Sequence, residues 1–411
     1  MRQYDVVIAG GGMVGASLAC CLATASKGAI SVLVVEGFAL PNNVSKPSYQ
    51  PSFDARSTAL SAGSKVIVEA MGVWQKLSEH LQSIEQIHVS NKGRLGSALM
   101  DAAQENLAAL GYVVENQWLG KVLLAEVQRH ACIEWRSPAK VSILDTAAEK
   151  SVVTISQNDV AEKIACSLLV IADGAHSALA QSIGIQYSEN DYHHTAIIAN
   201  IATAKPHAGL AYERFTDIGP LAMLPLVANQ GVNRSALVWT MPDEQAQQVI
   251  ELSDEDFLLR LQGRFGYRLG KLQRVGERAS YPLKLVEACE QIRGGVVVMG
   301  NAAHFLHPVA GQGFNLALRD VASLCELVCG AKARGDDVGS LSLLEQYRAS
   351  QAWDQRKTTV FSDKVGEVFM ADQAIFAALR DLGLGALDLV PPMKSRFVKE
   401  TAGLLGVRTK W

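Results

Sequence analysis

The chain of 411 residues lacks an excess of charge of either sign: 38 lysines and arginines oppose 41 aspartates and glutamates, for a formal net charge of -3. A protein that holds a nucleic-acid backbone presents a basic field to the phosphates, so a nucleic-acid partner is not expected. The chain also lacks the low hydrophobicity and high charge of disordered proteins, since 49% of its residues are hydrophobic and 19% are charged. A chain of this length is expected to form about two or three folded domains.

Patterns for disulfides and metal sites are also missing. The chain has seven cysteines, an odd number, and no C-x-x-C pair. In a long chain, this pattern is typical of free thiols in a reducing compartment. The close histidine sets are His193 with His194 and His304 with His307, and neither has a cysteine or carboxylate at the spacing of a zinc site. We therefore expect no metal.

One stretch approaches the length of a membrane span, the uncharged residues 6–26. Three consecutive glycines at 10–12 would break a spanning helix, and Asp5 precedes the stretch where a signal peptide carries positive charge. A buried strand, a glycine turn and a buried helix account for the whole segment. The chain is therefore expected to be cytoplasmic.

The order of apolar segments predicts an α/β fold. Residues 4–9 are typical of a buried parallel strand, 13–25 of a helix of small residues, and 30–36 of a second buried strand, which together form a βαβ unit. A loop rich in proline, asparagine and serine follows at 41–52. Further strands are predicted at 133–136, 141–144, 152–156, 166–172 and 294–300, and helices from about Ser61, over 116–131, from Gln312 and over most of 340–390.

The stretch from about 185 to 283 has a different character. Its strand-like runs, with one helical insert near 254–262, suggest an antiparallel sheet; the runs are 195–203, 210–215, 220–227 and 234–240. We therefore expect a discontinuous dinucleotide-type domain interrupted by a sheet domain. The expected divisions are 1–184, which includes sheet-domain strands near 83–100, the inserted sheet domain at 185–290, a completing segment at 291–335 and a helical region at 336–411.

Residues 10–15, GGGMVG, match the G-x-G-x-x-G turn of dinucleotide sites, directly after the first strand and at the start of the first helix. Gly10 allows the tight turn, Gly12 lets a pyrophosphate approach the backbone, and Gly15 lets the helix pack close to the strand. The amides and dipole at the helix N-terminus hold the anion. Glu36 ends the second strand, where its carboxylate can accept hydrogen bonds from a ribose diol and disfavours a 2'-phosphate.

Two further segments indicate which dinucleotide the site binds. LLVIADGAHS (168–177) places Asp173 after one buried strand, and VVVMGNAAHFLHPVAGQGFNLALRD (296–320) places Gly300 and Asn301 after another. With the glycine turn, these segments resemble the three fingerprints of the FAD-dependent aromatic hydroxylases of the para-hydroxybenzoate hydroxylase type, over most of residues 1–330. The runs HPVAGQGFNLALRD, DARSTALS (54–61), GPLAMLPL (219–226) and SYPL (280–283) are similar to the ubiquinone-biosynthesis branch of that family, in particular to its 2-polyprenyl-6-methoxyphenol hydroxylases.

The resemblance implies a Rossmann-like FAD-binding domain, an inserted antiparallel-sheet substrate domain and a helical C-terminus. It also implies which residues hold FAD: Gly10, Gly12 and Gly15 at the pyrophosphate, Glu36 at the adenosine ribose, Arg56 and Gln117 along the phosphate and ribityl portion, Asp173 near both FAD and the nicotinamide donor, Gly300 and Asn301 at the ribityl chain, and Gly311, Gly313 and Asn315 at the flavin ring. Independently of any family, backbone amides exposed by Gly311 and Gly313 at a helix start suit the negative charge of reduced flavin.

Two positions depart from the family pattern. Asn301 stands where the family has aspartate; its amide oxygen still accepts a hydrogen bond but lacks the charge, so weaker ribityl binding is expected. Leu179 and Ala180 stand where the family often has arginine, which leaves the contact to the nicotinamide unassigned.

By resemblance, NADPH or NADH binds transiently and reduces FAD, molecular oxygen adds to the reduced flavin as a C4a-hydroperoxide, and the distal oxygen atom of the hydroperoxide is transferred to the ring of a polyprenylated phenol. No catalytic residue is assigned, because Tyr212, Tyr281 and the histidines all remain possible activators of the phenol. For His304 and His307, a role in turn shaping or packing is favoured over acid–base chemistry.

The last residues, 391–411, carry five basic side chains against Glu400, mixed with apolar residues; the basic ones are Lys394, Arg396, Lys399, Arg408 and Lys410. This composition suits contact with an anionic membrane, and so a peripheral association with the inner membrane, or with another protein of ubiquinone biosynthesis; a solvated helix end is an equal alternative. Two other hypotheses stay open for the whole chain: hydroxylation of another ring position, and a flavin-binding scaffold of a biosynthetic complex.

Overall fold

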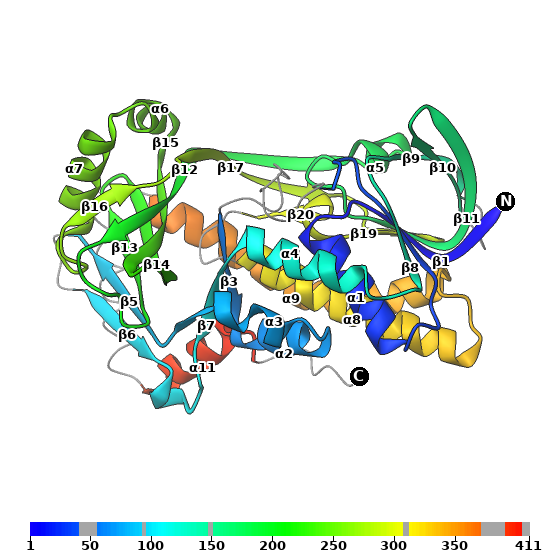
Figure 1. The fold of residues 1–411 in the computed structure, drawn as a ribbon, viewed down its shortest axis with the longest axis horizontal. Coiled ribbons are helices and arrows are strands. Elements are labelled where there is room, and N and C mark those ends of the chain that lie inside the picture. Colours follow the sequence, from blue (N-terminus) through cyan, green and yellow to red (C-terminus); the bar gives the residue numbers. More distant parts are fainter. Residues whose placement is uncertain (41–55, 93–95, 147–150, 307–311, 371–390, 405–411) are drawn as a thin grey trace.

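The computed structural model describes residues 1–40, 56–92, 96–146, 151–306, 312–370 and 391–404. Two lobes lie at opposite ends of the molecule in Figure 1, and two long strands, β12 (Tyr187–Thr203) and β17 (Ala279–Ala288), run between them. The expected loop at 41–52 and the expected helical residues 371–390 lie outside the described ranges. No helix within those ranges has both the length and the apolar composition to cross a membrane.

One lobe is built on a mixed sheet whose central strands are parallel. The strands follow the order β18-β19-β11-β1-β2-β8, with β10 paired to β11 and β9 to β10. Their bounds are β1 (Arg2–Ala9), β2 (Val32–Val35), β8 (Ile133–Arg136), β9 (Lys140–Thr146), β10 (Ser151–Gln157), β11 (Val160–Ile171), β18 (Ile292–Arg293) and β19 (Val296–Val298). β1 pairs in parallel with both β2 and β11, so the carboxyl ends of these strands meet at one edge, where α/β sheets bind their ligands.

Helices cover this sheet and supply most of its core. The 13-residue helix α1 (Met13–Ala25) packs against α4 (Asn116–Val127) and the long α8 (Gln312–Arg334), and α8 packs against α9 (Leu341–Met370). The expected helix from Gln312 is confirmed. All seven cysteines are free thiols, as predicted, and the sulfurs of Cys325 and Cys329 lie 3.9 Å apart on α8.

The second lobe is built on a sheet with the order β20-β17-β12-β15-β14-β13-β5-β6, and β16 pairs with β12. Its remaining strands are β5 (Gln86–Asn91), β6 (Ser97–Asp101), β13 (Leu210–Thr216), β14 (Gly219–Asn229), β15 (Val232–Pro242), β16 (Leu272–Val275) and β20 (His304–Phe305). The pairs formed within residues 187–288 are antiparallel, as expected, and β5, which joins the sheet from an earlier part of the chain, pairs with β13 in parallel. A parallel pair needs a long connection, and β5 indeed comes from a distant part of the chain.

Two helices, where one was expected, cover one face of this second sheet: α6 (Asp243–Ile250) and α7 (Asp254–Phe265). Between the lobes lie a small sheet of β3 (Ser57–Ser61), β4 (Gln82–Ile84) and β7 (Gly111–Glu115), the helices α2 (Ala62–Ala70) and α3 (Trp74–Leu77), and, in the C-terminal region, α11 (Pro391–Thr401); α5 (Ala178–Ser182) follows β11. The strand expected at 294–300 is shorter, because Gly300 begins a turn of 3-10 helix.

A largely buried ion pair ties the small sheet between the lobes, and the start of α4, to the second lobe. Arg234 of β15 donates to both carboxylate oxygens of Glu115, at 3.2 and 3.1 Å, and the Asn200 amide donates to the same carboxylate at 3.2 Å. Since Glu115 precedes α4 and is 8% exposed, the pair fixes the start of that helix against the second sheet.

We expect Glu115→Gln to lower the free energy of unfolding by about 1 to 3 kcal/mol, because it replaces a charge-assisted pair with a neutral contact and leaves the arginine poorly matched. Urea unfolding followed by circular dichroism measures this. Glu69→Gln, which removes the exposed pair with Lys65, is the matched control and should change stability by less than about 0.5 kcal/mol. Equal effects of the two substitutions would contradict a structural role for Glu115.

Candidate functional site

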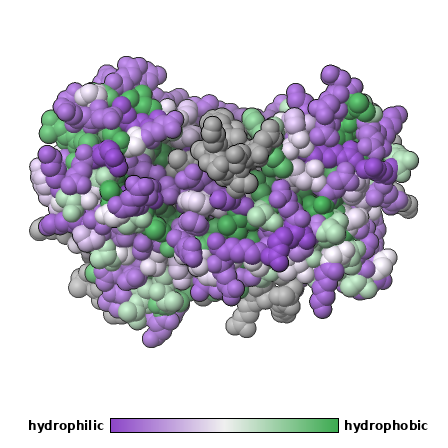
Figure 2. Space-filling model, in the orientation of Figure 1, coloured by the Kyte–Doolittle hydropathy of each residue, from purple (hydrophilic) through white to green (hydrophobic). Residues whose placement is uncertain are grey.

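A large cavity, of about 1570 Å³, joins the edge of the first sheet to one face of the second. Typical pockets for one small ligand measure roughly 300 to 1,000 Å³, so this cavity has room for a dinucleotide and a second molecule. In Figure 2, apolar residues are visible among polar ones across the middle of the molecule, between the two lobes. The lining includes the glycine turn with Glu36, the segment from Arg56 to Ser61 with Asn116, the residues that follow β11, the start of β9, and the inner face of the second sheet. Asn301, the start of α8 and the end of α11 complete it.

The glycine turn has the geometry of a phosphate cradle. Gly10 has φ of +104°, and a Cβ there would lie 2.3 Å from the carbonyl oxygen of Ala172. A Cβ at Gly15 would lie 1.9 Å from the carbonyl oxygen of Gly10, so only glycine lets α1 approach the strand end this closely. Gly12 lines the cavity as the N-cap of α1, and neither a side-chain cap nor an acidic residue occupies the first turn. The helix amides are therefore available to an anion.

Glu36 is held beside this turn. One carboxylate oxygen accepts a hydrogen bond from the Gly11 amide at 2.7 Å, and the other accepts one from the Phe38 amide at 2.9 Å. Both the turn and Glu36 line the cavity. This arrangement gives a ribose diol a fixed carboxylate next to the pyrophosphate site.

Asp173 lies across the glycine turn, just after β11. It is exposed where it lines the cavity, and desolvation by the surrounding protein raises the pKa of the Asp173 carboxyl despite a hydrogen bond from Ser177. Gly174 and Leu179 also line this end, so an apolar side chain occupies the region where the arginine was missing from the pattern.

Of the predicted residues that follow β19, one packs against α1 and others line the cavity. Gly300 has φ of +60°, and a Cβ there would meet the Val14 side chain at 2.9 Å, so this glycine allows close packing on α1 and does not line the cavity. Asn301 is exposed and lines the cavity, as does Gly313 in the first turn of α8. Gly311 and His307 lie outside the described residues.

Asn315, near the start of α8, lines the cavity, but its side chain is engaged by the protein. Its amide oxygen accepts hydrogen bonds from the Ser61 amide at 2.8 Å and the Ser64 hydroxyl at 2.7 Å, and its amide nitrogen donates to the Ala59 carbonyl at 2.8 Å. The side chain is 2% exposed. Asn315 therefore joins α8 to β3 and α2, and a ligand would meet this position through groups other than its side-chain amide.

Of the two residues predicted along the middle of the cofactor, Arg56 and Gln117, only Arg56 lines the cavity. Arg56 lines it, with its guanidinium carbon 4.7 Å from the centre of the Tyr281 ring. Gln117 does not line it; the preceding residue, Asn116, does, and its side-chain oxygen accepts a hydrogen bond from Thr58 at 2.7 Å. The polar start of α4 thus meets the cavity one residue earlier than expected.

His304 is buried behind the cavity, where its Nε2 lies 3.3 Å from a carboxylate oxygen of Asp320 on α8. Both side chains are almost completely buried, and neither lines the cavity. The location fits the packing role favoured for His304 from the sequence.

The sequence did not single out Glu213, which places a carboxyl on the cavity wall formed by the second sheet. The available signal was the alternation along β13, where an acidic residue stands between Ala211 and Phe215 on the inward side.

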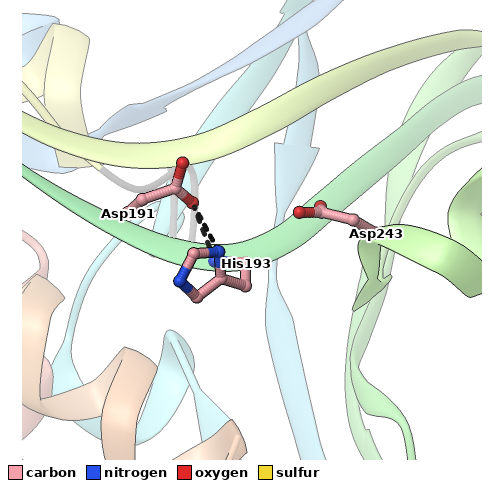
Figure 3. Close-up of side chains that lie close together, drawn as sticks. All are labelled: Asp191, His193 and Asp243. Atoms are coloured by element: carbon pink, nitrogen blue, oxygen red, sulfur yellow. Dashed lines mark hydrogen bonds and ion pairs between the residues drawn. The ribbon is translucent and has the colours of Figure 1, made fainter.

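Two residues in the first half of β12, Asp191 and His193, lie close to Asp243 at the start of α6, and their potential ligand atoms lie within 4.8 Å of one another (Figure 3). Asp191 already accepts a hydrogen bond from the His193 amide at 2.8 Å and pairs with Lys284 at 3.2 Å, and Asp243 accepts one from Thr195 at 2.7 Å. The contacts of this cluster are those of an irregular strand, where the pairing of β12 with β17 shifts register.

We expect Asn315→Ala to lower the free energy of unfolding by about 2 to 4 kcal/mol, because it removes three hydrogen bonds and leaves the buried Ser61 amide without its acceptor. Asn301→Ala, the same substitution on an exposed cavity residue, should change it by less than about 0.5 kcal/mol. Thermal and urea unfolding of the protein without added ligand measure both. A stable Asn315→Ala variant would show that the three bonds are dispensable.

The residues fit a bound FAD. The cradle at Gly10, Gly12 and Gly15 admits a pyrophosphate, Glu36 is positioned for a ribose, and the cavity continues from there to Asn301 and the first turn of α8. The same cavity extends beyond this path to the second sheet, which leaves space for a substrate.

Comparison with known proteins agrees with this fit. The model of the FAD binding domain family matches residues 3–360. Ubiquinone hydroxylase UbiL of Rhodospirillum rubrum is 34% identical over 404 residues, which cover 98% of this chain and 90% of that protein. The mitochondrial ubiquinone biosynthesis monooxygenase COQ6 of Homo sapiens is 26% identical over 441 residues, covering 96% of this chain and 92% of that protein.

Solved structures agree on the fold. p-Nitrophenol 4-monooxygenase PnpA from Pseudomonas putida has a TM-score of 0.79 at 18% identity, with 99% of this chain and 100% of that chain covered. PqsL from Pseudomonas aeruginosa, in complex with 2-aminobenzoylacetate, has a TM-score of 0.75 at 20% identity, with 93% and 99% covered. With the family model spanning most of the chain and UbiL similar over nearly all of it, the protein is a member of the FAD-binding monooxygenase family.

Proposed function

We propose that the protein hydroxylates 2-polyprenyl-6-methoxyphenol to 2-polyprenyl-6-methoxy-1,4-benzoquinol in ubiquinone biosynthesis, with FAD as cofactor and NADPH or NADH as transient electron donor. The observation that carries the proposal is the continuity of one cavity from a dinucleotide cradle to an apolar sheet face. The names of two similar proteins, UbiL and COQ6, support the pathway. The ring position rests on the resemblance of the sequence motifs.

The proposed division of labour follows the lining of the cavity. Gly12, Glu36 and Asn301 would hold FAD at its pyrophosphate, ribose and ribityl portions. Bound FAD would take two electrons from the nicotinamide and use oxygen to supply an electrophilic oxygen atom. The protein itself must orient the phenol and keep water away from the reacting atoms.

The second sheet supplies an apolar surface for a hydrophobic aromatic substrate. Its cavity face is mostly aliphatic and aromatic, and α11 closes the same region; the lining residues there include Ile87, Val89, Ala211, Phe215, Ala222, Leu224 and Val238 from the sheet and Phe397, Val398 and Ala402 from α11. Burial of a methoxyphenol ring and the first prenyl units against such a wall is favourable at about 25 cal/mol per Å² of apolar surface.

Delivery of the prenyl chain from a membrane surface, or from another protein of ubiquinone biosynthesis, is part of this proposal. Several charges of the C-terminal helix are engaged within the protein, since Lys399 lies 3.8 Å from a Glu105 carboxylate oxygen and Glu400 pairs with Lys357. Val398 and Ala402 are buried. Helix α11 is thus packed on the protein body, and Arg408 and Lys410 lie outside the described residues.

The test is mass spectrometry of quinone lipids from cells lacking the protein and complemented with wild type or Gly12→Trp. We expect 2-polyprenyl-6-methoxyphenol to accumulate without the protein, wild type to restore ubiquinone, and Gly12→Trp to fail, because an indole would fill the pyrophosphate cradle. Gly263→Trp is the matched control, since Gly263 is exposed on α7 with open space around it, and it should restore ubiquinone fully.

Three results would count against the proposal. Normal ubiquinone in cells lacking the protein would remove it from the pathway. Accumulation of a different precursor would move the hydroxylation to another ring position. Rescue by Gly12→Trp, in a purified form shown to lack FAD, would favour the scaffold hypothesis over catalysis.

A further inference from the structure

We propose that Glu213 is a catalytic residue that accepts the proton of the substrate's phenol hydroxyl during ring hydroxylation. The inference rests on the proposed hydroxylase function and deepens it, because it names the group that activates the ring. It arises from the placement of one carboxyl on the apolar wall of the cavity.

The alternation of β13 aims Glu213 at the cavity. Val89 of β5 and Ala222 of β14 are its direct cross-strand neighbours, and both line the cavity, as do Ala211 and Phe215 two positions away on either side. Tyr212, the next residue along the strand, packs its ring on Phe265 of α7, with centroids 5.3 Å apart. Glu213 therefore rises from an apolar patch on the face opposite the helices.

Within the described chain, the Glu213 carboxyl makes no hydrogen bond and no ion pair. The other charged side chains that line the cavity are Glu36, Arg56, Lys140, Asp173, Arg396 and Glu400, and those on the back of the sheet near β13 are His88, Arg214 and Arg268. Burial alone raises the pKa of Glu213 to about 7, so none of these charges compensates the carboxylate. An unpaired buried carboxylate is costly, and a donor from a ligand would satisfy it.

A phenol hydroxyl is such a donor. As the proton moves from the phenol oxygen to the Glu213 carboxylate, the oxygen lone pair enriches the ring, and a ring carbon forms a bond to one atom of O2. That carbon then loses its hydrogen as a proton when the ring regains aromaticity. Two electrons from NADPH or NADH and one further proton reduce the second oxygen atom to water. Overall, phenol, O2, NAD(P)H and a proton give benzenediol, NAD(P)⁺ and water, and Glu213 returns its proton.

A general base is most effective when its pKa lies near the working pH, which is where burial places this carboxyl. The other groups considered from the sequence are less suited. Tyr212 lines the cavity, but its ring packs on Phe265 of α7 and burial raises the pKa of its hydroxyl, which disfavours the ionised form that would act as a base. Tyr281 lies against the Arg56 guanidinium and does not line the cavity. His304 lies beside Asp320, and no histidine in the described ranges lines the cavity.

The test compares purified holoenzymes of wild type, Glu213→Gln and Glu213→Asp on a 2-prenyl-6-methoxyphenol with a short side chain. For Glu213→Gln we expect kcat to fall by about 100-fold, KM to change by less than about threefold, and more NAD(P)H to be consumed per hydroxylated product. The rate of FAD reduction should stay unchanged. Wild-type kcat should rise with pH through about 7, this rise should disappear in Glu213→Gln, and Glu213→Asp should retain it at a lower rate. Glu69→Gln, on the exposed face of α2, is the control and should behave as wild type.

A second measurement is independent of turnover. Since the pKa of Glu213 is higher in the folded protein than in the unfolded chain, where it is about 4.3, the folded state loses stability as pH rises from about 4 to 7. Glu213→Gln should therefore have a higher Tm than wild type above pH 7 and an equal Tm below about pH 4. Identical Tm profiles would mean that the carboxyl has another partner.

Retention of the wild-type kcat and pH profile by Glu213→Gln would overturn the inference and leave the hydroxylase function intact. Absence of phenol hydroxylation by a wild-type protein that still binds and reduces FAD would instead overturn the proposed function, and the role of Glu213 with it. Recovery of activity in Glu213→Gln on a ring-fluorinated phenol, whose hydroxyl ionises without help, is expected and would separate proton removal from binding.

Discussion

The close approach of α1 to the ends of β1 and β11 is the constraint on which the site depends. Gly15 faces the Gly10 carbonyl oxygen, and Gly10 faces Ala172, at distances that no side chain would permit. This approach puts the first amides of α1 next to Glu36 and Asp173 at the carboxyl edge of the sheet. Gly300, in the segment that follows β19, also allows a close approach to α1, because the Val14 side chain of α1 occupies the space where a Cβ on Gly300 would lie. Three segments far apart in sequence thus meet around one helix terminus.

The parts of the fold that follow local rules were predictable from the sequence. α1 has the bounds that its small residues and flanking glycines indicate, and β1 and β2 appear as buried parallel strands. The parallel pairing of β5 with β13 was not predictable, because it joins residues more than a hundred positions apart and no turn motif marks it. β19 ended early for a local reason, since the positive φ of Gly300 turns the chain before the predicted end.

Asn301 and Asn315, both in the motif at 296–320, show that a sequence motif does not reveal what a residue contacts. Each was placed near FAD by resemblance, yet the side chain of Asn315 is used by Ser61, Ser64 and Ala59, whereas that of Asn301 opens into the cavity. A motif records that a residue type is required, and only the contacts reveal whether the protein or a ligand requires it. A buried amide whose groups are satisfied rigidifies its surroundings, which suits a residue that fixes α8 against β3 beside the cavity.

The two ends of the cavity differ in the polarity of their lining residues. Around the glycine turn the protein offers amides, carboxylates and an amide side chain, which match the phosphates and hydroxyls of a dinucleotide. On the second sheet it offers aliphatic and aromatic side chains around the Glu213 carboxyl, which has no partner among the described residues and whose raised pKa implies a cost to folding at neutral pH. A sequence selected for stability alone would place a neutral residue at position 213, since glutamine or leucine would not carry that cost. An uncompensated cost on the wall of a ligand cavity is expected where binding or catalysis requires the group, and it is the feature of this sheet that packing does not explain.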